Sequence, residues 1–234
     1  MMTATLNIGD QIRPWGALNY GTLGLFCTDK DGVLFFVTCD HVIKTLSTPE
    51  NGPQKIYFPL ESEFSGKIGI FEGQCLVSKN KAIADLALIR ATIEVASATT
   101  LPAAIPSTNV IQLRKAVAPS KGDEVMLWGA RTAAYHSGVV LQTNSTHAWP
   151  HQKYGLVKYK KQFSVVLGSQ YTPEIGDSGG YVISPDGHLV GMIAALSGTV
   201  TEAGNPIIHC VPIKECCELL GVTPVTKSKK ELSE

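Results

Sequence analysis

The sequence predicts an all-β protein of two six-stranded antiparallel β-barrels, followed by a short C-terminal helix. Short apolar stretches recur along the chain between turn residues, a pattern typical of β-strands. Glycine occurs 22 times and hydrophobic residues make up 44% of the chain, which suits a turn-rich globular protein. The length of 234 residues allows one domain of two barrels or two small domains.

Six strands are expected in the first half of the chain. They are predicted at 20–28, 33–39, 55–59, 67–71, 74–78 and 85–90. The turn Asp29-Lys30-Asp31-Gly32 separates the first two strands, and six strands are enough to close one small barrel. We therefore assign residues 1–17 to an N-terminal lead-in and residues 18–98 to the first barrel.

The second half repeats this strand count, although the sequence itself does not repeat. Strands are predicted at 123–128, 135–142, 155–167, 180–184, 188–196 and 206–213. Residues 99–115 contain two prolines and show no clear period, so they are predicted to link the barrels, and residues 116–213 to form the second one. Residues 214–221 have helical spacing and end at Gly221, and residues 222–234 are predicted to be a charged tail.

The most informative motif is Gly176-Asp177-Ser178-Gly179-Gly180. Glycines on both sides place Ser178 on a tight turn, because glycine tolerates unusual dihedral angles and lets a substrate approach the main chain. Such a turn can also aim the main-chain N–H groups of Gly176 and Ser178 at one point, which is how an oxyanion hole is built. The motif therefore predicts a nucleophilic serine.

Two other residues support a catalytic interpretation. His41 follows the apolar run 33–36, and Asp85 opens a short alternating strand. A serine hydroxyl needs a base within reach, and an imidazole titrates near neutral pH. The carboxylate of Asp85 would hold the correct imidazole tautomer. Asp40 is a rival for this role, disfavoured because neighbouring residues of a strand point to opposite faces.

The order of these residues separates two kinds of serine hydrolase. The letters G-x-S-x-G also fit the nucleophile elbow of α/β-hydrolases, which require the acid and the histidine after the serine, and a helix directly behind it. Here His41 and Asp85 come before Ser178, and residues 181–187 form a strand and turn. The α/β-hydrolase alternative is therefore excluded.

On these residues the chain resembles the chymotrypsin-like (trypsin superfamily) serine proteases, and it is similar to their compact bacterial branches. The resemblance covers roughly residues 18 to 213 and is carried by the serine turn, its histidine and its aspartate, in that fold's order. It implies a serine endopeptidase that forms an acyl-enzyme, with His41, Asp85 and Ser178 as the triad and a protein or peptide as substrate.

The resemblance also implies a substrate pocket, with its floor at Thr172 and its wall on the strand that follows the serine. The pocket residues are Thr172, Glu174, Ala194, Ala195, Leu196 and, on a bordering strand, His209. No acid stands at Thr172, so we expect a small or medium uncharged residue before the scissile bond. Glu174 lies on the same loop and leaves a preference for Arg or Lys open. Relatives that select glutamate place a histidine on the wall strand, and this chain has none there.

Asp177 needs a partner of its own, because a buried carboxylate without one is costly. In digestive relatives this partner is an N-terminal amine released by an activating cleavage, but the chain lacks an Ile-Val-Gly-Gly segment. Arg131 resembles the basic position that bacterial relatives use near this loop. With a one-residue shift, Arg131 is a candidate partner of Asp177, and the identity of that partner stays open.

The charge balance excludes several functional classes. Twenty basic and twenty acidic residues cancel, so neither nucleic acid nor a membrane surface is an expected partner. No apolar run approaches the roughly 20 residues that span a bilayer, and no secretory leader is visible. These observations predict a cytoplasmic protein.

All six cysteines are expected to be free thiols, which agrees with a reducing compartment. His209, Cys210, Cys216 and Cys217 could offer zinc ligands, but their spacing matches no familiar tetrahedral pattern. We expect no metal and no cofactor. The remaining histidines are interpreted as surface or strand residues: His136, His147, His151 and His188.

Two alternatives to a simple protease stay open. A catalytically silent relative could act as a peptide-binding or scaffold module, although all three triad positions are filled. An intracellular bacterial protease could also depend on an activating or regulatory partner protein.

Overall fold

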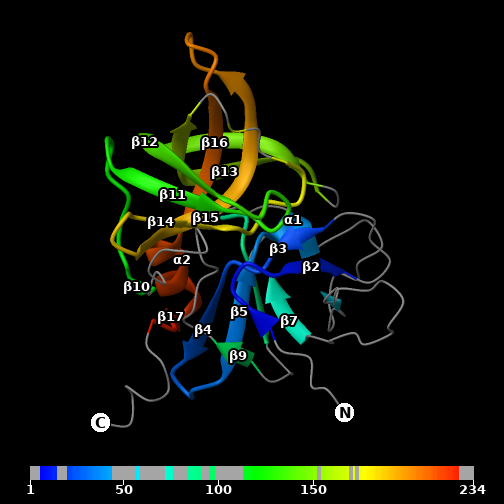
Figure 1. Ribbon diagram of the computed structural model, residues 1–234. Helices are drawn as coiled ribbons and strands as arrows, with labels where there is room; N and C mark the ends of the chain where they lie inside the picture. Colours follow the sequence, from blue (N-terminus) through cyan, green and yellow to red (C-terminus); the bar gives the residue numbers. More distant parts are fainter. Residues whose placement is uncertain are drawn as a thin grey trace.

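The computed structural model describes residues 6–14, 20–43, 56–57, 72–75, 84–90, 95–97, 113–151, 154–168, 171 and 174–226. Within these residues the chain is built almost wholly of strands, with two helices, α1 (Asp40–Ile43) and α2 (Ile213–Leu220). The predicted all-β class is thus confirmed. Figure 1 shows the strands in two bodies, a lower one from the N-terminal part of the chain together with the C-terminal strand β17, and an upper one from the rest of the C-terminal part.

The upper body is a closed six-stranded barrel. Each of its strands pairs with the next in the order β15-β14-β11-β12-β13-β16, and β16 pairs back onto β15. A seventh strand, β10, lies parallel to the start of β15. The bounds are β10 (Arg114–Ala116), β11 (Glu124–Trp128), β12 (Tyr135–His151), β13 (Gly155–Leu167), β14 (Tyr181–Ile183), β15 (His188–Val200) and β16 (Pro206–Pro212).

The lower body contains three sheets within the described residues. The largest has five strands in the order β17-β4-β5-β8-β7, and the others join β3-β2-β6 and β1-β9. The bounds are β1 (Leu6–Asn7), β2 (Gln11–Pro14), β3 (Gly21–Thr22), β4 (Leu25–Asp29), β5 (Leu34–Thr38), β6 (Ile56–Tyr57), β7 (Glu72–Cys75), β8 (Ala87–Arg90), β9 (Val95–Ser97) and β17 (Val222–Pro224).

Several predicted boundaries differ from the structure, and two of these differences concern whole stretches of chain. Residues 222–224, expected to be part of a charged tail, form β17 and pair with β4. The strand predicted at 135–142 continues to His151 as β12, since its second half pairs with the start of β13. The predicted strand at 67–71 lies outside the described residues.

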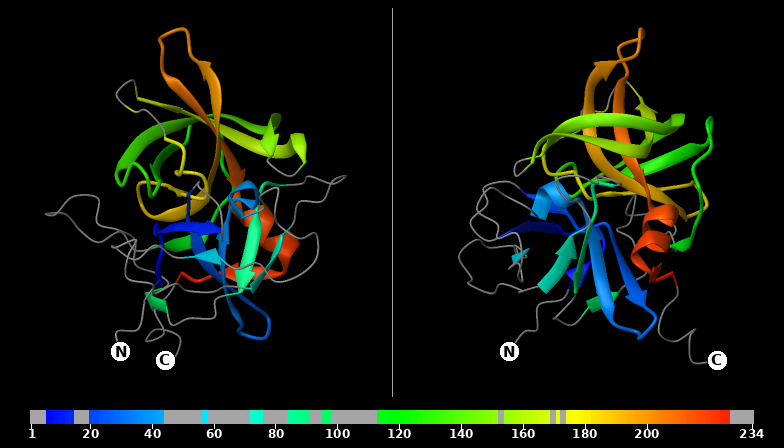
Figure 2. Two further views of the ribbon diagram at one scale, coloured as in Figure 1. Left: turned by 90° about the vertical axis from the view of Figure 1, so that its right-hand side faces the viewer. Right: turned by 180° about the vertical axis from the view of Figure 1, so that it is seen from behind.

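The second half of β12 and the first half of β13 pair as two antiparallel segments that we name the β12–β13 arm (145–151 and 155–162). Figures 1 and 2 show this arm crossing the upper body toward α1 of the lower body. Tyr159 of the arm is fully buried and Trp149 is 6% exposed, so the arm packs into the protein rather than standing in solvent.

Two hydrophobic clusters form the core. One fills the upper barrel and includes Val125, Phe163 and Ile208. The other runs from the lower body to the arm and α2, where Cys216 and Cys217 are buried. The helix ends as predicted at Gly221, whose left-handed φ of 66° lets its N–H reach the carbonyl oxygens of Cys217 and Glu218. No helix among the described residues is long and apolar enough to cross a membrane.

Candidate active site

The serine turn occupies residues 176–180, just before β14. Gly179 has a φ of +92°, and a Cβ atom there would collide with the carbonyl oxygen of Thr22. Glycine is therefore required at this position. The hydroxyl of Ser178 donates a hydrogen bond to the carbonyl oxygen of Ala194 over 3.2 Å. Among the described residues it makes no hydrogen bond to His41.

A short relay of hydrogen bonds ties this turn to the lower body. The main-chain N–H of Thr22 donates to the carbonyl oxygen of Ser178 over 2.8 Å. The carbonyl oxygen of Thr22 in turn accepts the hydroxyl of Thr38 over 2.7 Å. Thr38 stands three residues before His41, so the relay sets the serine turn and the start of α1 relative to each other.

His41 and Asp85 lie side by side in the lower body. His41 is in α1, and its Nδ1 is 2.5 Å from Oδ2 of Asp85. The main-chain N–H of His41 also donates to Oδ1 of Asp85 over 3.0 Å. The side chain of Asp85 is fully buried, whereas that of His41 is 22% exposed. The predicted histidine and acid are thus brought together, with the imidazole still open to a substrate.

The electrostatics of this pair favour an ion pair. Burial by itself would lower the pKa of His41, but the charge and hydrogen bond of Asp85, helped by the charge of Asp40, raise that pKa above its ordinary value. Burial by itself would raise the pKa of Asp85, but the charge and hydrogen bonds of His41 hold it below its ordinary value. Asp85 is therefore ionised at neutral pH.

A third donor to Asp85 was missed by sequence reasoning. The indole N–H of Trp149, in the arm, donates to Oδ2 of Asp85 over 2.9 Å. The two residues are 64 positions apart, and no spacing rule links a strand tryptophan to a distant aspartate. Only the folded chain brings them together.

The carboxylate of Asp40 pairs with His151, whereas that of Asp85 pairs with His41. The prediction treated residue 40 as part of a strand, whereas it begins the helical turn α1. The carboxylate of Asp40 lies 3.1 Å from Nε2 of His151, and both side chains are fully buried. The preference for Asp85 over Asp40 is supported by the contacts of His41, although the strand argument behind it was wrong.

Asp177 is held by main-chain N–H groups rather than by an arginine side chain. Its Oδ1 accepts the N–H of Arg131 (3.1 Å) and of Thr132 (3.0 Å), and its Oδ2 accepts the N–H of Glu174 (3.1 Å). The hydroxyl of Tyr171 adds a donor to Oδ2 at 3.3 Å. The guanidinium of Arg131 is instead paired with the carboxylate of Glu174 at 2.9 Å, at the surface. Arg131 does contact Asp177, but through its backbone.

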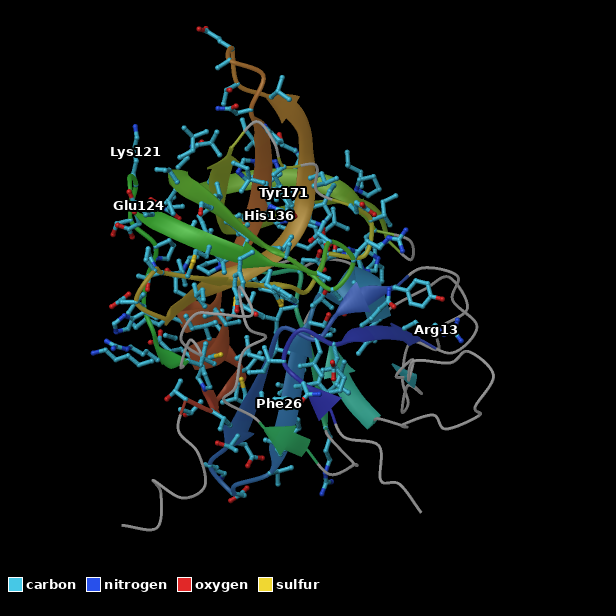
Figure 3. The ribbon with its side chains drawn as sticks, in the orientation of Figure 1. Arg13, Phe26, Lys121, Glu124, His136 and Tyr171 are labelled. Atoms are coloured by element: carbon cyan, nitrogen blue, oxygen red, sulfur yellow. The ribbon has the colours of Figure 1, made fainter. Side chains whose placement is uncertain are left out.

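Tyr171 links Asp177 to the interior of the upper barrel. Its ring lies against that of His136, with the ring centres 3.6 Å apart (Figure 3). Gly129 passes so close to Asp177 that a Cβ atom at Gly129 would collide with the carboxylate. The loop before Ser178 is therefore fixed from inside the protein by main-chain donors, the Tyr171 hydroxyl and close packing.

The predicted oxyanion donors are also on this turn. Among the main-chain hydrogen bonds of the described residues, neither the N–H of Gly176 nor that of Ser178 acts as a donor. The neighbouring N–H groups of Asp177, Gly179 and Gly180 do have acceptors. Within the described residues, the two amides that the sequence assigns to an oxyanion hole thus have no main-chain acceptor.

The predicted pocket residues divide between two faces of the β15–β16 pair. Ala194 has no cross-strand partner, because the register shifts between Ile193 and Ala195. This bulge presents the Ala194 carbonyl to Ser178. Beyond it, Ala195 pairs with His209, and Leu196 pairs with Ile208 on the other face. Thr172 lies outside the described residues.

His209 belongs to a cluster of polar side chains on the arm side of β16. Its ring stacks on that of His147 with centres 3.6 Å apart, and its Nδ1 is 3.2 Å from the hydroxyl of Ser164. Burial, together with the charge of the neighbouring imidazole, lowers the pKa of His209 to about 4. Burial also lowers the pKa of His147. Both rings are therefore neutral at physiological pH.

Potential metal donors come together at one place among the described residues, Cys39 with His41 and Asp85, within 4.8 Å of one another. These atoms already bond to protein groups: the thiol of Cys39 donates to the carbonyl oxygen of Ile193 over 3.1 Å. Five described cysteines are free and buried: Cys27, Cys39, Cys210, Cys216 and Cys217.

Comparison with known families agrees with this geometry. The model of the trypsin-like peptidase domain matches residues 22–192, which include His41, Asp85 and Ser178. The chain belongs to the trypsin-like peptidase family. No curated protein sequence matches it significantly.

Solved structures show the same fold for this trypsin-like peptidase. A Nocardiopsis protease matches with a TM-score of 0.67 and 17% identity, over 94% of this chain and 99% of its own. A chymotrypsin from Cellulomonas bogoriensis matches with a TM-score of 0.66 and 17% identity, over 96% and 100%. A glutamic acid-specific serine protease, described as using a histidine triad in substrate binding, matches with a TM-score of 0.66 and 18% identity, over 93% and 98%. The resemblance seen in the sequence, to chymotrypsin-like bacterial serine proteases, is confirmed.

Proposed function

We propose that this trypsin-like peptidase is a serine endopeptidase in which Ser178 attacks the peptide carbonyl, His41 accepts and returns the proton, and Asp85 orients His41. The observation that carries the proposal is the 2.5 Å contact between His41 Nδ1 and Asp85 Oδ2. That contact leaves the other ring nitrogen of His41 to face the substrate. The hydrogen bonds of Thr22 to Ser178 and Thr38 connect the serine turn to the part of the lower body that carries His41.

The proposed reaction begins when a substrate enters and the hydroxyl of Ser178 turns from the Ala194 carbonyl to Nε2 of His41. The N–H groups of Gly176 and Ser178 then donate hydrogen bonds to the negatively charged oxygen of the tetrahedral intermediate. The imidazolium returns its proton to the leaving amine, and water repeats the sequence on the acyl-enzyme. No metal or cofactor takes part in this scheme.

The test is loss of hydrolysis in Ser178→Ala and His41→Ala proteins. Each should lose several orders of magnitude of kcat/KM on a peptide or ester substrate, because serine and histidine act as one unit. A fluorophosphonate probe should label the parent protein at Ser178 and should not label Ser178→Ala. Ser184→Ala, which changes a serine just after β14, is the matched control and should keep full activity.

The same experiment decides between this function and the silent-module alternative. A folded parent protein that neither hydrolyses a peptide library nor reacts with the probe, yet binds peptides, would be a scaffold or binding module. We place the active enzyme in the cytoplasm, because its described cysteines are free thiols. Regulation by a partner protein would be tested by comparing the rate of peptide hydrolysis by the isolated protein with its rate after cell extract has been added.

For the residue before the scissile bond we propose a small or medium uncharged side chain. Ala194, Ala195 and Leu196 of the proposed wall carry no charge, so this wall offers no partner for a charged side chain. A second candidate is glutamate, favoured by the stacked His147 and His209 and by the histidine triad named for the glutamic acid-specific relative.

A further inference from the structure

The carboxylate of Asp85 receives a hydrogen bond from each of the two bodies of the protein. On the lower side, His41 approaches Oδ2 through Nδ1 and Oδ1 through its main-chain N–H. On the upper side, the indole N–H of Trp149 donates to Oδ2 over 2.9 Å. We infer that Trp149 is a positioning residue, which holds Asp85, and through it His41, in register with the upper barrel that carries Ser178. This inference rests on the proposed function.

The ring of Trp149 is fixed in place by its neighbours. It stacks on the fully buried ring of Tyr159 with centres 4.2 Å apart and an angle of 18° between the planes. On the side of His209 the ring centres are 6.1 Å apart and the planes nearly parallel, at 9°. Trp149 itself is 6% exposed. A ring packed in this way cannot turn its N–H to water, so the hydrogen bond to Asp85 is built into the core.

A second contact of the same kind lies two residues further along β12. His151 meets the carboxylate of Asp40 at 3.1 Å, and both side chains are fully buried. Residues i and i+2 of a strand point to the same face, so Trp149 and His151 reach the lower body together. Asp40 directly precedes His41 in the sequence, and Asp85 forms a hydrogen bond with the His41 ring. The end of the arm therefore contacts both acids that flank the catalytic histidine.

This arrangement matters because the proposed triad is split between the two bodies. His41 lies in α1 and Asp85 just before β8, both in the lower body, whereas Ser178 lies just before β14 of the upper body. Proton transfer requires the serine oxygen and the imidazole nitrogen within hydrogen-bond reach, and a displacement of about 1 Å costs roughly 100-fold in rate. A donor from the upper body to the buried acid restricts such a displacement.

Loss of the indole N–H would also change how strongly the Asp85 carboxylate interacts with His41. Several groups surround the His41–Asp85 pair: Asp40 and Cys39 near α1, His151 on β12, and Tyr159 on β13. Of the two hydrogen bonds to Oδ2, the one from Trp149 stabilises the carboxylate without involving His41. Without it the carboxylate becomes a stronger acceptor and holds the imidazolium more tightly, so the pKa of His41 rises.

The test replaces Trp149 by phenylalanine, which keeps an aromatic ring on Tyr159 and removes the N–H. In Trp149→Phe we expect the ascending limb of kcat/KM to move up by about 0.3 to 1 pH unit, and the plateau to fall about tenfold. Trp128→Phe is the matched control, since the N–H of Trp128 has no hydrogen-bond partner among the described residues. It should change neither quantity.

A direct measurement separates this inference from the proposed function. The pKa of His41, followed by NMR in the resting protein, should rise in Trp149→Phe and stay unchanged in Trp128→Phe, whether or not any substrate is hydrolysed. If Trp149→Phe does not fold, benzothienylalanine at position 149 keeps the shape of the indole and lacks only the N–H. A folded variant of either kind with the parent's His41 pKa and plateau rate would overturn the inference. Absent hydrolysis in the parent, with the pKa shift present, would overturn the proposed function alone.

Discussion

The main-chain N–H of Arg131 donates to the carboxylate of Asp177, while the guanidinium of the same residue turns outward to Glu174. The loop before Ser178 is thus held by a buried carboxylate that collects backbone donors from two segments, 131–132 and 174. Within the described part of the chain, no positive side chain forms an ion pair with this carboxylate, and the Arg131 guanidinium pairs with Glu174. The two kinds of contact can be told apart by mutation, because replacing Asp177 removes the acceptor of the backbone N–H groups, whereas replacing Arg131 by alanine removes only the guanidinium.

Asp177→Asn should destabilise the protein and impair catalysis. The amide NH2 of asparagine would face N–H donors on one side, leaving buried groups unsatisfied at a cost of about 2 to 3 kcal/mol. The turn that carries the Gly176 and Ser178 amides would loosen, so kcat should fall. Arg131→Ala is the control for stability, and for kcat/KM on a substrate with an uncharged residue before the scissile bond: it removes only an exposed ion pair worth about 0 to 1 kcal/mol. Urea unfolding measures the loss of stability, and kcat/KM measures the loss of catalysis. Equal losses in the two variants would contradict the role given to the Asp177 carboxylate.

The pH dependence of hydrolysis should follow His41. The imidazole must be neutral to accept the serine proton, and Asp85 and Asp40 raise its pKa above the ordinary value of about 6.5. Activity should therefore rise with pH through a midpoint above that of a free imidazole. In Asp85→Asn the midpoint should move to lower pH, and the rate should fall by roughly 10⁴. A kcat/KM profile with its midpoint below that of free imidazole in the parent would count against His41 as the base. EDTA should have no effect.

Asp10 should make the protein less stable as the pH rises. Burial raises the pKa of this carboxyl to about 6, so the folded state binds its proton more tightly than the unfolded state. The stabilisation is complete below the unfolded pKa of about 3.9 and is lost as the pH rises through the folded value. Asp10→Asn should match the parent near pH 4 and exceed its stability at pH 8 by about 1 kcal/mol, allowing for partial exposure. Denaturant unfolding curves of the parent and of Asp10→Asn at pH 4 and pH 8 measure this difference in stability. An equal difference at both pH values would contradict the raised pKa of Asp10.

Reducing agent should leave stability and activity unchanged. Five described cysteines are buried free thiols, and burial and neighbouring groups raise the pKa of those at Cys39 and Cys210, which keeps them protonated and unreactive. The sulfur atoms of Cys27 and Cys217 lie 3.9 Å apart, too far for a bond. Mass spectrometry of the non-reduced protein should detect no linked pair, and a Cys27–Cys217 crosslink in fresh protein would be the contrary result.

Cleavage of a peptide library should select small or medium uncharged residues before the scissile bond. Glu174 is engaged by Arg131 at 2.9 Å and so is held away from a pocket role. Arg131→Ala releases Glu174 and should raise the cleavage rate after Arg and Lys relative to the parent. Strong selection for Arg or Lys in the parent itself would make Glu174 the specificity residue, and selection for glutamate would assign that role to the histidine pair.

Much of this protein could be predicted from local patterns in its sequence. Apolar stretches between turn residues located the strands of the upper barrel, and β13 begins and ends at the predicted residues, 155 and 167. Gly221 marked the end of α2, because a left-handed φ is a property of one residue. The serine turn, with the order of His41, Asp85 and Ser178, predicted the family that the comparison confirmed.

The tertiary structure alone decided how these residues are held. Asp40 and His41 were treated as strand neighbours, whereas the chain forms the helical turn α1 there, and the contact expected from the Arg131 side chain is made by its backbone. The bond from Trp149 to Asp85 spans 64 residues and that from His151 to Asp40 spans 111. Strand periodicity and turn chemistry act over a few neighbouring residues and so are visible in the sequence. A contact across two barrels depends on where the whole chain folds, and it leaves no spacing in the sequence by which it could be found.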